Sequence, residues 1–417
     1  MAEQVLARRI SVPITFDGTD ITKDIKPYFR SLRYTDDMDD LTDDIQIGLQ
    51  DRDSIWLESW LQKAVEAAAG GKLKISAVIT PENWGNNGTL PTGDFELDTV
   101  DASGPPSIVT IKGTSLAFSA SLRQTKKSKA WENYTLSGIA SEIAGGGGMG
   151  CMYESAANPS YDRVEQVNQS DIDFLKKLCE DAGISIKATD GKIVLFDLAT
   201  YEAKPPVITI KRGKEGGYTK YKLSSGSADT QYSKCRVSYM DPATGKLIEG
   251  TAEDSSVTTE QCLEITAKVG SVGEAQALAE KHLRLHNKFS KKISFTFPGN
   301  TALVAAVTVQ LEDWGAWDGK YLVKKAAHTV DASGYTTKID GYATASAITS
   351  GGAPAETASA PFGGSTYTVK KGDSLWKIAK QLCGSGADWK KIYEANKDII
   401  GENPNLIYPG QTFTIPD

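Results

Sequence analysis

Residues 164–197 form the stretch that most restricts the fold of this chain, because they predict a helix followed directly by a hairpin. Ser170 is a side chain that caps helices, and acidic residues follow it in the expected first turn, where negative charge is favourable. Gly183 ends the helix, and Asp190-Gly191, a strong hairpin signal, joins two strand-like runs. The apolar stripe comprises Ile172, Leu175, Leu178 and Cys179, and the strand-like runs cover residues 184–188 and 192–197. The predicted unit is therefore helix, strand, tight turn, strand.

The length and composition limit the classes of protein that this chain can belong to. Its 417 residues predict about two to four domains. The net charge of −7 argues against a nucleic-acid-binding protein, which normally carries a basic stripe. No run of about 18 apolar residues occurs, so we expect no transmembrane helix and no membrane partner. The N-terminal residues lack the apolar core of a signal peptide, and the five scattered cysteines indicate incidental thiols in a protein made in a reducing cytoplasm.

Two long segments, residues 1–118 and 205–346, predict mostly β structure. One helix is predicted in each segment, over residues 53–69 and 272–289, from an apolar face at helical spacing. Candidate strands cover residues 10–16, 44–49, 73–80, 94–103 and 106–112 in the first segment, and 207–211, 231–240, 246–250, 261–267, 292–297, 304–311, 321–329 and 335–342 in the second. We predict that each segment folds as a small β-barrel.

The segment between them, residues 119–204, mixes helices and strands. Leu136 to Ala144 predicts a short helix with Thr135 as its cap, and four glycines at 145–148 end it. Consecutive glycines can cradle a phosphate, but no strand leads into these and no Gly-Lys-Ser/Thr follows. We therefore interpret them as a loop.

An acidic run between residues 36 and 44 has two possible interpretations, a cation site or a solvated acidic loop. The calcium pattern Asp-x-Asp/Asn-x-Asp/Asn-Gly is not met, because no glycine follows at the required offset. We therefore favour a solvated loop or a wall that faces water. The run comprises Asp36, Asp37, Asp39, Asp40, Asp43 and Asp44.

The three histidines of the chain are candidate metal ligands. His282 and His286 lie four residues apart on the predicted helix, but Leu283 stands where the His-Glu-x-x-His signature requires glutamate. His328 lies far along the chain. Because His282 falls on the apolar stripe, we predict a packed, hydrogen-bonded core histidine, and we predict no metal or cofactor.

The last seventy residues predict a linker and a separate small domain. Residues 347–366 are small, polar and rich in proline and glycine, as is typical of flexible linkers. Beyond them, residues 367–370 and 412–415 predict strands, Asp373 or Ser374 caps a first helix, and residues 389–396 predict a second. The expected order is therefore βααβ.

Three blocks of the β-rich body resemble the baseplate hub proteins of phage tails. Gln166, the run Asn-Gln-Ser-Asp-Ile-Asp-Phe-Leu at 168–175 and Gly183 resemble the family block Q-x-x-E-S-D-x-D-F-L…G, with glutamine in place of the commoner glutamate at 169. The stretches 34–56 and 315–341 are similar to an early and a closing block of the same family. The chain therefore resembles the late control gene D family, which is related to the hub of type VI secretion spike proteins.

This resemblance implies a structural role. In that family each subunit supplies two similar barrels and three subunits form a ring with pseudo-sixfold symmetry. The implied protein is the hub of a contractile phage tail, tailocin or related injection particle, assembled in the bacterial cytoplasm and located in the tail baseplate. The implied partners are the tail tube protein, the spike protein and the tape measure protein, with the chain itself as a homotrimer.

The C-terminal segment closely resembles a LysM domain, through residues 372–379, 392–396 and 405–411. In LysM domains that bind N-acetylglucosamine chains, the groove lies between the first strand–helix loop and the loop before the last strand. The residues that this implies here are Gly372, Asp373, Ser374, Leu375, Asn405, Leu406 and Ile407. Two ligands stay open: peptidoglycan, or a baseplate wedge or sheath component, since the stretch 399–404 resembles LysM domains of phage baseplate proteins.

The alternative function is a peptidoglycan-binding cell-wall protein or a cell-wall hydrolase, because LysM domains often accompany such enzymes. No paired carboxylates, zinc pattern or nucleophile–histidine arrangement stands out, so we predict no catalytic residues and no enzyme. The predicted fold class is mainly β with α+β insertions. Its parts are a first hub β-barrel at 1–118, a mixed α+β hub domain at 119–204, a second hub β-barrel at 205–346, a linker at 347–366 and a βααβ LysM domain at 367–417.

Overall fold

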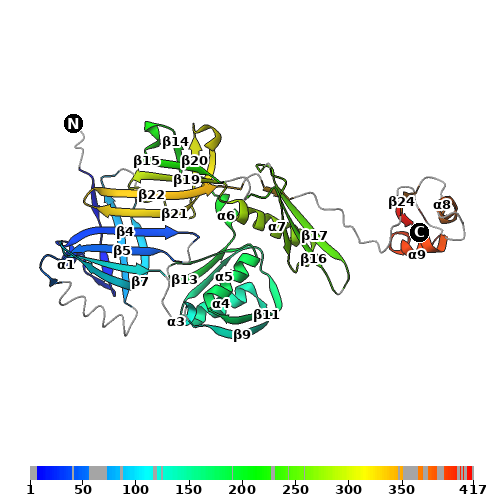
Figure 1. Ribbon diagram of the computed structural model, residues 1–417, viewed down its shortest axis with the longest axis horizontal. Helices are drawn as coiled ribbons and strands as arrows, with labels where there is room; N and C mark the ends of the chain where they lie inside the picture. Colours follow the sequence, from blue (N-terminus) through cyan, green and yellow to red (C-terminus); the bar gives the residue numbers. More distant parts are fainter. Residues whose placement is uncertain are drawn as a thin grey trace.

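One large, mostly antiparallel sheet connects the two β-rich segments of the chain (Figure 1). The computed structural model describes residues 7–39, 42–55, 73–84, 88–115, 120–123, 125–189, 191–226, 231–242, 244–257, 259–345, 348–350, 365–369, 374–382, 389–401, 404, 407 and 411–415. Within these residues the sheet has 14 strands. Their path runs β15-β19-β22-β21-β4-β5-β8-β7-β6-β2-β3, and β1, β14 and β20 pair beside it.

The first half of the sheet contains the strands predicted before residue 118. They are β1 (Arg9–Ser11), β2 (Ile14–Phe16), β3 (Thr19–Asp20), β4 (Phe29–Asp37), β5 (Asp44–Gln50), β6 (Lys74–Glu82), β7 (Leu90–Ser103) and β8 (Ile108–Thr114), with the short helix α1 (Thr22–Ile25) after β3. Alternate residues of these strands point into one core, which includes Leu32, Ile45, Ile75 and Phe95. Most of the helix predicted at 53–69 lies outside the described residues.

The second half of the sheet has a core of its own. Its strands are β14 (Ile208–Lys211), β15 (Lys220–Ser225), β19 (Lys291–Pro298), β20 (Thr308–Glu312), β21 (Gly319–Asp331) and β22 (Gly334–Ala343). Phe295, Trp314, Tyr321 and Ile339 are buried between them. Two cores on one sheet fit the expectation of two similar β units in the chain.

The two halves join edge to edge through β4 and β21. Residues 32–37 of β4 pair with residues 325–330 of β21, so the ladder continues from one half into the other. At this seam the ring of Tyr34 stacks on the ring of His328, with 5.9 Å between centroids. The mainly β fold class with α+β insertions is confirmed. The described strands do not close, in either half, into the barrel that we had predicted. In the second half β14 and β15 stand at the two ends of the strand path and do not pair, and in the first half the end strand β4 pairs with β21.

The mixed segment contains the predicted helices and hairpin, together with strands and short helices that we had not predicted. The first two of the four glycines belong to a helix and not to a loop. It contains α3 (Ala120–Arg123), β9 (Lys127–Thr135), α4 (Leu136–Gly146), β10 (Gly150–Glu154), β11 (Ser160–Gln169), α5 (Asp171–Asp181), β12 (Ser185–Thr189), β13 (Lys192–Phe196) and α6 (Leu198–Glu202). Thr135 caps α4 by accepting a hydrogen bond from the Gly138 amide at 3.2 Å. Ser170 caps α5 by accepting one from the Asp173 amide at 3.1 Å. Both caps and the β12–β13 hairpin are confirmed.

A separate four-stranded sheet holds three strands that we predicted within the second barrel, at 231–240, 246–250 and 261–267, and a fourth strand from the predicted linker. It consists of β16 (Lys234–Met240), β17 (Leu247–Asp254), β18 (Cys262–Thr266) and β23 (Ile348–Ser350), in the order β18-β16-β17-β23. Helix α7 (Val272–Asn287) packs on it through Ala275, Ala279 and Leu283. These four strands therefore form no part of the large sheet, because among the described residues they pair only with one another.

The C-terminal domain has the βααβ order, with one short helix more. Its elements are β24 (Ser365–Thr368), α8 (Leu375–Leu382), α9 (Trp389–Ala395), α10 (Lys397–Ile400) and β25 (Thr412–Ile415). Part of the predicted linker is not a linker, because 348–350 form β23 and 365–366 belong to β24; residues 351–364 lie outside the described residues. None of the helices in the described part is long and apolar enough to span a membrane.

Candidate functional site

The acidic run at residues 36–44 lies at a buried junction, and our interpretation of it as a solvated loop is wrong. Asp36, Asp37 and Asp43 are 7%, 2% and 2% exposed. Lys187 of β12 lies between Asp36 and Asp43, with 2.9 Å from its Nζ to an Asp43 oxygen and a second ion pair to Asp36. Two buried carboxylates thus share one lysine, whose side chain is 13% exposed, and this ties the mixed domain to the end of β4.

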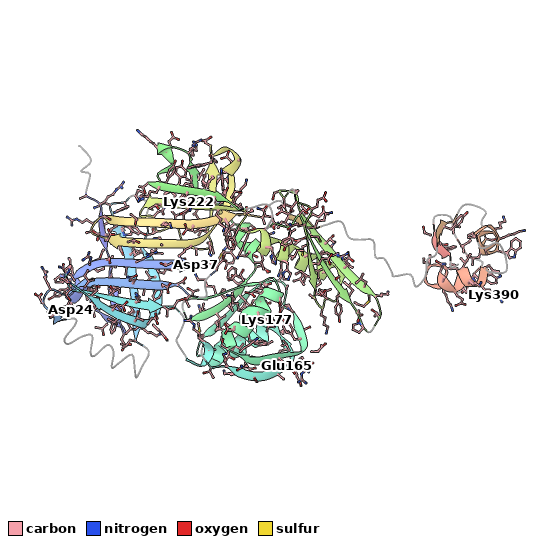
Figure 2. All side chains as sticks on the ribbon, in the orientation of Figure 1. Asp24, Asp37, Glu165, Lys177, Lys222 and Lys390 are labelled. Carbon is pink, nitrogen blue, oxygen red and sulfur yellow. The ribbon has the colours of Figure 1, made fainter. Side chains whose placement is uncertain are left out.

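The same run also binds the second half of the sheet and the end of α7. Asp37, labelled in Figure 2 at the end of β4, pairs with Lys325 of β21 at 3.1 Å. Asp39 pairs with Lys288 at 3.1 Å and with Lys324 at 3.4 Å. One short segment therefore holds three parts of the molecule together. Within the run, Asp44 is exposed and Asp40 lies outside the described residues.

Burial dominates the electrostatics of this junction. It raises the pKa of the Asp43 carboxyl to about 6, with Asp36 adding to the shift and Lys187 opposing it. Burial alone would lower the pKa of Lys187, but the two carboxylates outweigh it and raise that pKa. Asp43 accepts hydrogen bonds from the Thr189 hydroxyl at 2.9 Å and the Asp37 amide at 3.1 Å. These contacts enclose the carboxylate, so we interpret the cluster as a structural joint and not as a catalytic site.

The block at residues 166–175, which resembles the hub family, holds the turn between β11 and α5 in place. The Gln166 side-chain amide donates to Asp171 at 2.9 Å and to the Gln169 carbonyl at 3.1 Å. Lys127 pairs with the other oxygen of Asp171 at 2.6 Å. Together these bonds fix the turn between β11 and α5, and the side chain of residue 169 takes no part in them. This fits the tolerance of glutamine at that position.

The histidines are packed as predicted for His282. The His282 ring is 8% exposed and donates from Nε2 to the Asp181 carbonyl at 3.2 Å. His328 is fully buried; its Nε2 donates to the Leu303 carbonyl at 3.0 Å and its Nδ1 accepts from the Tyr335 hydroxyl at 2.8 Å. Burial lowers the pKa of His328 to about 4. Among the described residues, no group of three or more histidine, cysteine or acidic side chains could hold a metal ion.

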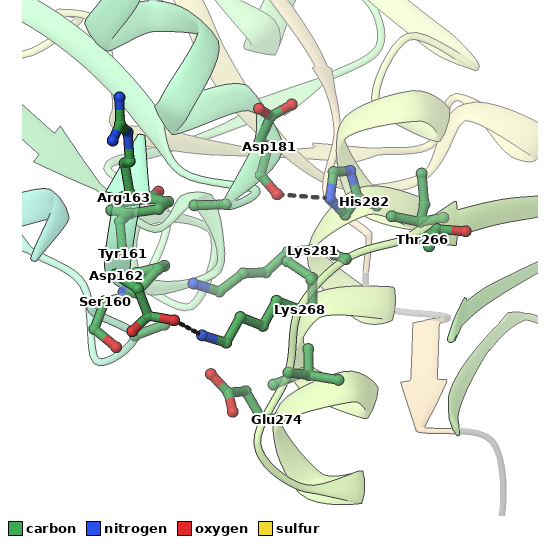
Figure 3. A pocket seen from close by; sticks show the side chains of 18 residues that line it. Ser160, Tyr161, Asp162, Arg163, Asp181, Thr266, Lys268, Glu274, Lys281 and His282 are labelled. Carbon is green, nitrogen blue, oxygen red and sulfur yellow. Dashed lines mark hydrogen bonds and ion pairs between the residues drawn. The ribbon is translucent and has the colours of Figure 1, made fainter. Parts of the chain in front are cut away.

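A cleft of about 570 Å³ lies between the mixed domain and α7 (Figure 3). Its walls come from the start of β11, the end of α5, the end of β18 and one face of α7. Asp162 and Lys268 form an ion pair across it, and Lys281 pairs with Asp197 at 2.6 Å. Because these lysines are already neutralised, the cleft offers neither an unpaired lysine nor an arrangement of the kind that catalysis needs.

The LysM groove is described only in part. Ser374 is exposed and caps α8, accepting from the Lys377 amide at 3.3 Å. Leu375 is only 3% exposed, and its side chain belongs to the domain core with Ile378 and Phe413. Ile407 is half-buried against the same core. Gly372, Asp373, Asn405 and Leu406 lie outside the described residues, and the binding role of the groove stays a prediction.

Comparisons with known proteins establish the class of protein. The family model for the phage tail baseplate hub (GPD) matches residues 117–334, more than half of the chain, and the LysM domain model matches residues 367–416. The chain therefore belongs to the phage tail baseplate hub family and carries a LysM domain. Both resemblances drawn from the sequence are confirmed.

Individual relatives agree with this assignment. A probable baseplate hub protein of Escherichia phage 186 is 26% identical over 205 residues, 48% of this chain and 49% of that protein. The alignment thus spans about half the length of that relative. The potassium binding protein Kbp of Escherichia coli is 49% identical over 51 residues, 12% of this chain and 34% of that protein. The crystal structure of the prophage MuSo2 43 kDa tail protein from Shewanella oneidensis aligns with a TM-score of 0.56 at 14% identity, over 80% of this chain and 98% of that one.

Proposed function

We propose that the chain forms a homotrimeric ring at the centre of a contractile tail baseplate, joining the tail tube to the spike. The observation that carries this proposal is the β4–β21 seam, where two units with separate cores continue one hydrogen-bonded ladder. Head-to-tail contacts of this kind between copies generate closed rings. Three chains with two units each then supply six units around the axis, which matches a hexameric tube. The tape measure protein occupies the lumen of this ring.

Light scattering on the full chain and on residues 1–350 tests the assembly. The truncation keeps β23 and removes the LysM domain. We expect a trimer for both proteins, which assigns assembly to the body of the hub. Monomers of both proteins at concentrations well above micromolar would contradict the ring.

We further propose that the LysM domain docks the hub onto a baseplate wedge or sheath component within the particle. The domain has its own core, built from residues 367–413, so it works as a module appended to the body. Each chain supplies one LysM domain, so avidity for a repeating glycan requires the assembled ring. The buried side chain of Leu375 also leaves the groove with less apolar surface for a sugar.

Peptidoglycan is the second candidate ligand, because LysM domains that bind N-acetylglucosamine chains use the groove to which the sequence points. A pull-down with insoluble peptidoglycan, comparing the full chain with residues 1–350, separates the two. We expect neither protein to sediment with the glycan. Sedimentation of the full chain alone would assign the domain to the cell wall, and loss of peptidoglycan turbidity on adding the protein would revive the hydrolase alternative.

A further inference from the structure

The cleft between the mixed domain and α7 has an apolar interior to which the proposed function assigns no role (Figure 3). Its apolar lining includes Pro159, Tyr161, Ile265, Val269 and Leu278. Its volume of about 570 Å³ lies in the range of clefts that enclose small ligands. An apolar side chain that enters such a cleft is stabilised there, because apolar surface on both sides is removed from water.

Two polar groups of the cleft have no hydrogen-bond partner among the described residues. His282 donates from Nε2 to the Asp181 carbonyl at 3.2 Å, which leaves its Nδ1 as an acceptor. Burial lowers the pKa of His282, so the ring is neutral near pH 7. The second group is the hydroxyl of Tyr161, on the mixed-domain side of the cleft in Figure 3. An acceptor and a donor within an apolar lining suit the N–H and C=O groups of a peptide backbone.

The linker that follows β23 starts in the direction of this cleft. Ser350 pairs with Ala252 of β17, and the same row of the sheet continues through Cys235 to Leu263 of β18. Because β23 runs parallel to β16 and β18, the chain leaves Ser350 towards the level of Ile265, which lines the cleft. β18 is the third strand from β23, a lateral distance of about 14 Å.

The linker is long enough to reach the cleft and contains one side chain that suits it. Residues 351–364 are alanine, glycine, proline and polar residues, with Phe362 as the one large apolar residue. The residues from 351 to 361 can span at most about 36 Å, more than twice the lateral distance to β18. Pro361, directly before the phenylalanine, restricts the free backbone and so reduces the entropy that docking costs.

We propose that Phe362 of this chain docks in the cleft between the mixed domain and α7, and that the linker thereby holds the LysM domain beside the hub body. The phenylalanine ring packs among the apolar side chains of the cleft. His282 Nδ1 accepts a backbone N–H of the segment, and the Tyr161 hydroxyl donates to a backbone carbonyl. Because Phe362 precedes the first residue of β24, Ser365, by three positions, docking keeps the LysM domain close to α7. The proposal depends neither on the ring nor on the ligand of the LysM domain.

Fluorescence anisotropy with a labelled peptide of residues 351–366 tests the proposal on the full chain. In the Phe362→Ser variant the linker lacks the side chain that fills the cleft, so this variant should bind the peptide saturably. The wild type should bind it about tenfold more weakly, because a tethered segment competes at an effective concentration in the millimolar range. A reference peptide that itself carries Phe362→Ser should bind neither protein.

Substitutions in the cleft identify the site. Added to Phe362→Ser, Ala277→Arg fills the cleft from an exposed position on α7 and should abolish peptide binding. Ala102→Arg, at an exposed position on β7 that does not line the cleft, makes the same change and should leave affinity within about twofold. Tyr161→Phe removes one hydrogen bond and should weaken binding about fivefold.

Small-angle X-ray scattering examines the linker of the full chain without an added peptide. The Phe362→Ser variant should have a larger maximum dimension than the wild type, because its LysM domain is no longer held beside α7. Equal dimensions of the two proteins would overturn the proposal.

Three results with the peptide would also overturn it. If Ala277→Arg leaves peptide affinity unchanged, the peptide binds outside the cleft. If the wild type and Phe362→Ser bind the peptide equally, the linker of the chain does not occupy the site. If the reference peptide binds as tightly as the natural sequence, the phenylalanine plays no part in recognition.

Discussion

At the scale of single residues, Lys187 is the charge that joins the mixed domain to the end of β4. Among the described residues, Lys187 is the one cation that pairs with both Asp36 and Asp43, and Lys187→Met leaves these two buried carboxylates without it. We expect a loss of about 3–5 kcal/mol in the free energy of unfolding, measured by urea titration. Lys192→Met, on the exposed start of β13, should change it by less than about 0.5 kcal/mol. Equal effects of the two substitutions would contradict the assignment.

Asp43 gives the same junction a pH dependence whose sign can be stated. Its pKa in the folded protein is about 6, above the ordinary value of 3.8, so the folded protein takes up this proton more readily than the unfolded chain. The contribution of Asp43 to the free energy of unfolding therefore rises as pH falls from about 7 towards 4. Asp43→Asn should remove that contribution, so the wild type gains on the variant between pH 7.5 and pH 5. Parallel pH profiles of the two proteins in urea unfolding would contradict the raised pKa.

At the scale of elements, the sequence predicted that Ser170 caps helix α5. A substitution at this residue can measure how much the cap stabilises the protein. Ser170→Ala removes the acceptor for the Asp173 amide and should cost about 1 kcal/mol. Ser170→Gly loses the same side chain but tolerates the extended backbone of the cap, so it should cost only a few tenths. Thermal unfolding of both variants measures the difference. Equal losses would mean that the bond to the amide contributes little and that other contacts hold the turn.

The elements also show where sequence patterns stop being informative. Ser170, Thr135 and the β12–β13 hairpin were predictable because their signals are local and lie within a few residues. The pairing of β4 with β21 was not, since alternation marks a strand but carries no information about a partner almost 300 residues away. The insertion of β16–β18 was missed for the same reason.

The acidic run at residues 36–44 shows why the candidate site could not be predicted from the sequence. Six aspartates in nine residues predict a solvated loop when the sequence is read alone. In the structure, Lys187, Lys288 and Lys325 pair with four of them. The one local hint was a lysine between Ile186 and Ala188, which are both buried. A lysine at such a position suggests an ion pair but does not name the partner, which lies about 150 residues earlier in the chain.

At the scale of the whole molecule, the contacts predict two independent units of unfolding. The seam joins both halves of the large sheet, and the aspartate junction fixes the mixed domain and α7 to them, so these parts should unfold in one transition. The core of the LysM domain contains only residues of its own segment, so this domain should unfold separately. Ile392→Val removes one buried methyl group from that core at a cost of about 1 kcal/mol and should lower the LysM transition by about 5 °C or more. Leu32→Ala in β4 should lower only the other transition. Differential scanning calorimetry of both variants separates the two, and a shift of both transitions by either substitution would show that the LysM domain is energetically coupled to the hub.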